Sequence, residues 1–133
     1  MYLDLLNKQE QKDFLELAYH IMGVDGTCDV NEIGIITNYK FECHLADYQP
    51  CKQDDLKVVI NSLVGSTKKS KKIIIIELLG IVLGNGEMCE KETEFIAMLS
   101  NELRIKEFEV ARIKRWVEAM NDIFREGYEI ISK

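Results

Sequence analysis

Apolar residues recur at intervals of three and four positions along almost the whole chain, which is the spacing of one face of an α-helix. The first stripe predicts a helix over residues 8–24 and consists of Phe14, Leu17, Ala18, Ile21 and Met22. The second stripe predicts a helix that ends near residue 43, and its members are Ile33, Ile35, Ile36, Tyr39, Phe41 and Cys43. Later stripes predict helices from Asp54 to about residue 64, through residues 95–103, and from Lys106 to Ile131. The chain is therefore expected to be all-α.

Residues 73–83 are the longest apolar stretch, interrupted only by Glu77 and Gly80. Four consecutive isoleucines favour a strand, whereas the length of the stretch and its alignment with the first helix favour a buried helix. We predict a helix and, because it is apolar on nearly every side, place it at the centre of the bundle. Glu77 is expected at its one polar edge or beside a lysine. The stretch is shorter than the ~20 residues that a membrane span requires, so no span is expected.

A short acidic turn occurs twice, 60 positions apart, at residues 25–32 and 85–92. Each turn follows one apolar helical segment and precedes another. With this offset residues 21–36 share four identities with residues 81–96, which are Ile21 with Ile81, Gly26 with Gly86, Glu32 with Glu92, and Ile36 with Ile96. We therefore predict a single domain, residues 1–133, that forms a helical bundle of about six to seven helices in two helix-turn-helix halves, residues 8–65 and 68–131.

Composition narrows the class of protein. The chain has 133 residues, 47% of them hydrophobic, and a single proline, which is typical of one ordinary folded domain. A net charge of −6 argues against binding nucleic acid by surface attraction, and the lysine-rich segment 65–72 is interpreted as a solvated linker between the halves. We find neither a signal peptide nor a transit peptide, so a cytoplasmic protein is expected. Four cysteines form no CxxC pair and are expected to be buried free thiols.

The acidic turns have a structural interpretation. In each turn a glycine would end one helix, and Asp29 or Cys89 would cap the next helix while Glu32 or Glu92 reaches back to the cap. Calcium binding by an EF-hand is excluded, because apolar residues and a glycine occupy the positions of its first and third ligands. Helix capping therefore explains either turn taken alone.

The two turns share a pattern: Asp or Asn, then Gly, then Glu six residues after the Gly, between two apolar helices. In this pattern residues 14–120 resemble the TerB-like family, which is named for a tellurite-resistance protein. The resemblance implies an all-helical bundle of about seven helices, with pseudo-twofold halves and an acidic surface proposed to bind divalent metal. It carries over Asp25, Glu32 and Glu92, while Asn85 stands where the family often has a second Asp.

If the two turns lie at the same end of the bundle, their carboxylates surround one negative patch. The hypothesis is a weak divalent-cation site there, and its candidate metal-binding residues are Asp25, Asp29, Glu32, Glu87 and Glu92, with Glu90 also in the patch. Carboxylate oxygens favour Ca²⁺, Mg²⁺ or Mn²⁺ over zinc, which prefers nitrogen and sulfur. No other cofactor is expected, and no catalytic residue is assigned.

Three functional hypotheses follow. The favoured one is a non-enzymatic TerB-like binding or adaptor domain in a stress response such as tellurite resistance, with a protein partner that the sequence does not identify. The alternative is a metal-assisted hydrolase that uses Asp25 and Glu32, although no nucleophile is paired with a base. The third is a purely structural homodimer, because the end of the last helix, around Tyr128 and Ile131, is expected to reach beyond the bundle and contact a second copy. Trp116 is expected in the core.

Overall fold

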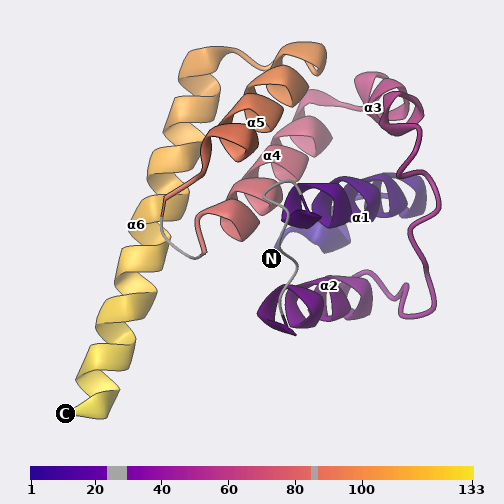
Figure 1. The fold of residues 1–133 in the computed structure, drawn as a ribbon. Coiled ribbons are helices and arrows are strands. Elements are labelled where there is room, and N and C mark those ends of the chain that lie inside the picture. Colours follow the sequence, from indigo (N-terminus) through magenta and orange to yellow (C-terminus); the bar gives the residue numbers. More distant parts are fainter. Residues whose placement is uncertain (24–29, 85–86) are drawn as a thin grey trace.

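The computed structural model describes residues 1–23, 30–84 and 87–133, and all of their side chains except those of residues 30–32. These residues form one short 3-10 helix and six α-helices (Figure 1), namely η1 (Leu3–Leu5), α1 (Lys8–Gly23), α2 (Val30–Glu42), α3 (Leu56–Val64), α4 (Lys68–Val82), α5 (Glu90–Glu102) and α6 (Glu107–Ser132). No strand occurs in this part of the chain, so the prediction of an all-α bundle is confirmed for it. None of these helices is long and apolar enough to cross a membrane.

Helices α1 and α4 form the centre of the bundle. Helix α1 contacts α2, α3 and α4, and α4 also contacts α5, α6 and η1, so each of the two lies among other helices (Figure 1). The predicted stripe of α1 is buried throughout. The buried apolar residues of α4 are Ile73, Ile74, Ile75, Leu78, Leu79, Ile81 and Val82. The prediction that residues 73–83 form a central helix is confirmed, and α1 shares that position.

The lysine-rich segment is not a linker. Helix α4 begins at Lys68, because the Thr67 hydroxyl caps it by accepting a hydrogen bond from the Ser70 amide at 3.2 Å. The four lysines lie in the first two turns of α4, where Lys68 forms an ion pair with Glu109 of α6 at 2.8 Å. Residues 65–67 alone connect α3 to α4.

Helices α2 and α3 differ in detail from the predictions. Ile33 and Phe41, predicted on the buried side of α2, are 56% and 75% exposed. Helix α2 lies at the edge of the bundle, where it contacts α1 and η1, so part of it faces solvent. Helix α3 begins at Leu56 after an N-cap at Asp55, one residue later than the predicted cap at Asp54.

The cysteines differ in exposure. Cys43 is buried, and burial raises the pKa of its thiol to about 11. Cys89 is partly buried, whereas Cys51 is exposed, so the prediction of buried thiols is wrong for Cys51. Cys28 lies outside the described residues.

Glu77 anchors the start of the chain to α4. Its side chain is buried and accepts a hydrogen bond from the Tyr2 amide at 2.7 Å. A second contact, at 3.1 Å, joins it to the amino group of Met1. The carboxylate is therefore paired with main-chain groups of the first two residues. A lysine partner, one of the two expectations for Glu77, is not what the structure shows.

A second buried carboxylate fastens the loop between α2 and α3 to the centre of the bundle. Glu16 of α1 is 0% exposed, and its carboxylate accepts hydrogen bonds from the Tyr48 hydroxyl, the Cys51 amide at 2.9 Å, the Lys52 amide at 3.1 Å and the Gln53 side chain at 2.8 Å. Four donors satisfy the oxygens of a buried charge. These partners lie 32 to 37 positions further along the chain, a separation at which no local spacing pattern relates them to Glu16.

Candidate interaction surface

Helix α6 is longer than the bundle that it covers. It runs for 26 residues, packs on α4 and α5, and then continues past the other helices into solvent (Figure 1). Val117 is its one buried residue, and the Asn121 side chain donates a hydrogen bond to the Leu83 carbonyl at 3.3 Å. We call the part that follows, residues 122–133, the free end of α6. The last helix reaches beyond the bundle as predicted.

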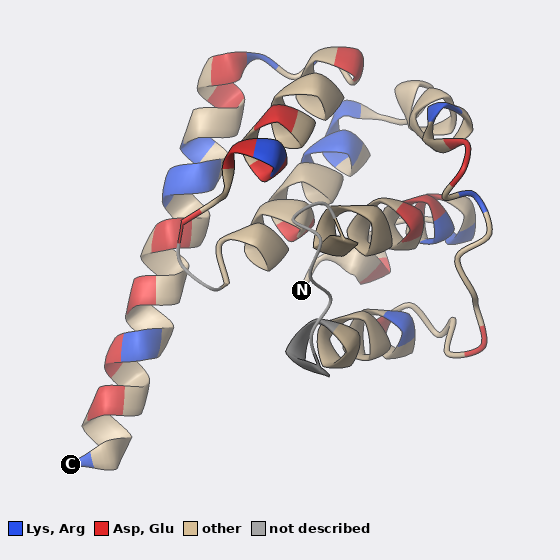
Figure 2. Cartoon of the chain, in the orientation of Figure 1, with Lys and Arg blue, Asp and Glu red and all other residues tan. Residues whose placement is uncertain are grey.

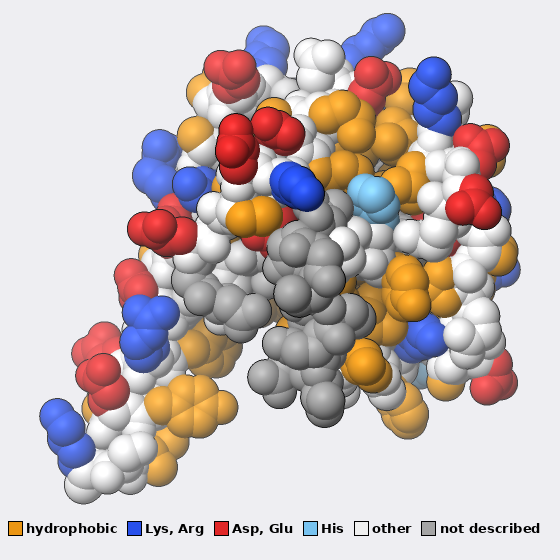
Figure 3. Space-filling model, in the orientation of Figure 1, with side chains coloured by type: hydrophobic (Ala, Val, Ile, Leu, Met, Phe, Trp, Pro, Cys, Tyr) orange, Lys and Arg blue, Asp and Glu red, His pale blue; other side chains and the backbone are white. Residues whose placement is uncertain are grey.

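The free end carries exposed apolar side chains on one side (Figure 3). The exposed fractions are 68% for Ile123, 59% for Phe124, 72% for Tyr128, 71% for Ile130 and 80% for Ile131. Positions seven apart lie almost in line along a helix, which aligns Ile123 with Ile130 and Phe124 with Ile131. Charged side chains lie along the free end (Figure 2), and they gather on the opposite side from the apolar ones (Figure 3). We call these five apolar residues the apolar face of α6.

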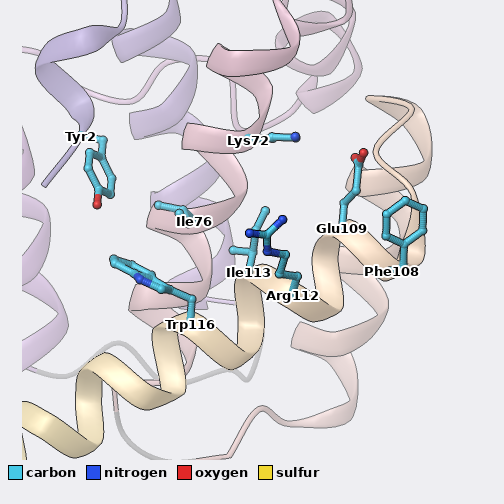
Figure 4. Close-up of a pocket in the computed structure, with 8 residues that line it drawn as sticks. All are labelled: Tyr2, Lys72, Ile76, Phe108, Glu109, Arg112, Ile113 and Trp116. Carbon is cyan, nitrogen blue, oxygen red and sulfur yellow. The ribbon is translucent and has the colours of Figure 1, made fainter.

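A surface pocket lies between α4 and α6, on the part of α6 that precedes the apolar face (Figure 4). Its volume is about 450 Å³, and it is lined by Tyr2, Lys72, Ile76, Phe108, Glu109, Arg112, Ile113 and Trp116. Trp116 is 42% exposed with its ring 6.2 Å from that of Tyr2, so the prediction of a core residue is wrong. It stands seven positions before Ile123, in line with the apolar face. Because tryptophan, tyrosine and arginine carry much of the binding energy at interfaces, the pocket extends the candidate surface toward the bundle.

The structure describes only part of the predicted cation site. Asp25, Asp29 and the side chain of Glu32 lie outside the described residues. Glu87 is exposed, and Glu92 is engaged at the start of α5. Within the described part of the chain, no three His, Cys, Asp or Glu side chains form a group that could hold a metal ion. The cation site therefore stays a prediction.

Cys89 and Glu92 form a capping box at the start of α5. The Glu92 carboxylate accepts a hydrogen bond from the Cys89 amide at 2.9 Å, and the Cys89 thiol accepts one from the Glu92 amide at 3.5 Å. The capping part of the structural interpretation is therefore confirmed for the second turn. Helix α4 ends at Val82 with its C-cap at Leu83, and Gly86, predicted to end it, lies outside the described residues. Sulfur is a weak hydrogen-bond acceptor, so a stronger acceptor at position 89 is expected to stabilise the start of α5.

Cys89→Ser is expected to raise the free energy of unfolding by about 0.5 kcal/mol, because a hydroxyl accepts the Glu92 amide better than sulfur does. Cys89→Ala removes the acceptor and is expected to lower the free energy of unfolding by about 1 kcal/mol. Urea unfolding followed by circular dichroism measures both changes. Equal stability of the serine and alanine variants would show that the side chain at position 89 does not support α5.

A divalent cation that binds the first turn is expected to raise the thermal midpoint of the protein. At a hundred times its dissociation constant the cation adds about 2.7 kcal/mol to the free energy of unfolding, which is a rise of several degrees. Asp25→Asn combined with Glu32→Gln should abolish the rise, and Glu129→Gln, on the free end of α6, is the control. An unchanged midpoint with Ca²⁺, Mg²⁺, Mn²⁺ and Zn²⁺ would reduce both turns to helix caps.

The apolar face and the pocket together form a candidate interaction surface. The apolar face lies on the part of α6 that extends past the bundle, and the pocket presents Trp116, Tyr2 and Arg112. Rigid aromatic groups beside a continuous apolar stripe are typical of recognition surfaces. Known proteins do not extend this assignment, because no protein-family model, no curated protein and no solved structure matches the chain.

Proposed function

We propose that this chain is a non-enzymatic binding or adaptor domain that recognises a protein partner through the apolar face of α6. The observation that carries the proposal is that five large apolar side chains, each at least 59% exposed, share one side of a helix in solvent. Contiguous apolar patches larger than a few hundred Å² mark interaction sites on folded proteins. A partner that covers such a patch removes its apolar surface from water, which contributes favourable free energy to binding.

The spacing on the free end suits one mode of binding. Amphipathic helices bind proteins by laying their apolar side into a groove or against another helix, with anchors at positions i, i+4 and i+7. Phe124, Tyr128 and Ile131 have this spacing, and all three are exposed. Trp116 and its pocket supply a further anchor site at the bundle end of the same stripe.

The TerB-like resemblance implies the same class of function. The element bounds support the two-half organisation that it implies, because α1 and α4 begin 60 positions apart, at Lys8 and Lys68, and α2 and α5 also begin 60 positions apart, at Val30 and Glu90. On this basis the proposal includes two related halves with the TerB-like order of helices. The resemblance alone assigns the binding to a stress response.

A photoreactive residue tests the proposal in cells that produce the protein. Substitution of Phe124 by p-benzoylphenylalanine is expected to give one discrete protein adduct on irradiation, and adding Ile131→Glu should abolish that adduct. The same photoreactive residue in place of Glu129, on the charged side, should give none. A lack of adduct at position 124, or equal adducts at both positions, would contradict the proposal.

A further inference from the structure

We infer that the partner on the apolar face is a second copy of this chain, and that two α6 helices pair in antiparallel orientation through their free ends. The inference rests on the proposed function, because it names the occupant of the same surface. Three observations carry it: the area of the apolar face, the side of α6 on which the bundle lies, and the glycine at position 127.

The exposed area matches what a dimer needs. Large aromatic side chains present roughly 150–250 Å² each, and isoleucine somewhat less. The apolar face therefore offers on the order of 600 Å² per copy at the observed exposures. This is at the top of the roughly 300–600 Å² range of the largest patch on a typical monomer. It matches the ~600 Å² that each partner contributes at the lower end of the standard interface size.

The bundle lies on the same side of α6 as the apolar face, which decides the orientation of a second helix. Val117, which is buried, stands seven positions before Phe124. Asn121, whose side chain bonds the Leu83 carbonyl, stands seven positions before Tyr128. A parallel partner on this side would bring both bundles to the same end of the helix pair, where they collide. An antiparallel partner puts the two bundles at opposite ends.

The free end sets the centre of the pairing. The bundle covers this side of α6 up to the start of the free end, so the overlap comprises residues 122–133, which is about 18 Å of helix at 1.5 Å per residue. The midpoint falls between Gly127 and Tyr128. Two-fold symmetry then places Gly127 of one copy opposite Tyr128 of the partner subunit, and each pair occurs twice.

Gly127 fits the centre of a helix pair. Glycine is a poor helix former, and a Cβ at this position would meet no described atom within 4 Å apart from the adjacent residues and the backbone of its own helix, so packing within one copy does not require glycine here. A second helix gives the glycine a role, because a position without a side chain leaves a hole that a large side chain of the facing helix fills. The ring of Tyr128 of the partner subunit is placed to fill it.

The charges of the free end favour a second copy over a lipid surface. Asp122, Glu126 and Glu129 against Arg125 and Lys133 give a net charge of −1, so two free ends repel each other only weakly. Helices that lie on membranes carry lysine and arginine on their polar side. The acidic polar side of α6 does not suit an anionic membrane.

The mass of the full chain in solution is the first test. Sedimentation equilibrium at several protein concentrations is expected to give a dimer, with twice the 15.4 kDa of one chain. Phe124→Glu combined with Ile131→Glu is expected to give the mass of one chain with unchanged helix content, because both residues lie beyond the bundle. The matched control, Glu126→Gln with Glu129→Gln on the charged side, is expected to remain a dimer.

Single cysteines test the orientation. In a background with Cys28, Cys51 and Cys89 replaced by serine, Gly127→Cys is expected to form an intermolecular disulfide on mild oxidation. Ile131→Cys is expected to form none, because an antiparallel pair separates the two copies of residue 131 along the helix axis. Tyr128→Cys, on the other side of the centre, should behave like Gly127→Cys. A disulfide at position 131 as well as at position 127 would overturn the antiparallel pairing.

A single-chain mass at every concentration, without a disulfide at position 127, would overturn the inference. The proposed function would survive that result if the photoreactive residue at position 124 still captured one different protein. Vesicles that contain phosphatidylglycerol test whether the apolar face binds an anionic lipid surface instead. Co-sedimentation of the wild-type chain with such vesicles, lost in Phe124→Glu, would overturn both the second copy and the protein partner.

Discussion

Ile74→Ala is expected to lower the free energy of unfolding by about 3 to 4 kcal/mol. Ile74 is 0% exposed in α4, one of the two central helices. Because α4 contacts α1, α5 and α6, no single neighbour can move to close the cavity that the lost atoms leave. Domains are stable by about 5–15 kcal/mol, so this substitution removes a large share of the total.

Ile76→Ala is the matched control for that prediction. It removes the same atoms from the same helix two positions later, but Ile76 is only partly buried and lines the pocket between α4 and α6. We expect a loss of about 1 kcal/mol. Urea unfolding followed by circular dichroism compares the two variants directly. Equal losses would contradict the central position of α4.

The positions of the helices were predictable because apolar residues recur at helical spacing in each of them, although in α2 two members of the predicted buried stripe, Ile33 and Phe41, are exposed. The predicted helix over residues 8–24 corresponds to α1 (Lys8–Gly23), and the last helix differs from its predicted bounds by one residue at each end. Such signals act within one or two turns of the chain. Asn7 and Glu10 form a capping box at the start of α1, in which the Glu10 amide donates to the Asn7 side chain at 2.8 Å and the Asn7 amide donates to the Glu10 carboxylate at 2.9 Å. The spacing of these two residues in the sequence is that of a capping box.

Local spacing does not determine which part of the apolar side of α6 is covered by other helices. Spacing predicts which side of a helix is apolar, but it does not predict what covers that side. Val117 and Phe124 belong to one row of α6, yet Val117 is buried and Phe124 is 59% exposed. The difference depends on where the other helices end, which no local pattern of α6 contains. The apolar stripe was therefore predictable from the sequence, as was the projection of its end around Tyr128 and Ile131 beyond the bundle, whereas the residue at which the cover ends required the structure.

Removal of the Glu16 carboxylate is expected to be almost as costly as the cavity in α4. Glu16→Ala is expected to lower the free energy of unfolding by about 3 kcal/mol, because it leaves four hydrogen-bond donors of the loop after α2 without their acceptor. Glu16→Gln keeps one acceptor oxygen and should lose roughly half as much. Glu94→Ala, at an exposed glutamate of α5, is the control and should change stability by less than about 0.5 kcal/mol.

Acid is expected to weaken the Glu16 contact. Burial raises the pKa of Glu16, but hydrogen bonds from Tyr48, Cys51 and Gln53 outweigh burial and hold the pKa below its ordinary value of 4.5. The stabilisation that a depressed pKa provides is complete at pH values above 4.5, and it is lost as the pH falls through the pKa of Glu16 in the folded protein. Asp13 has the opposite pH dependence, because burial raises its pKa, but it is present in both proteins and so does not change the difference between them. Because protonation of Glu16 removes its advantage over glutamine, the difference in the free energy of unfolding between wild type and Glu16→Gln should narrow in acid. A difference that stays constant with pH would assign the effect to packing.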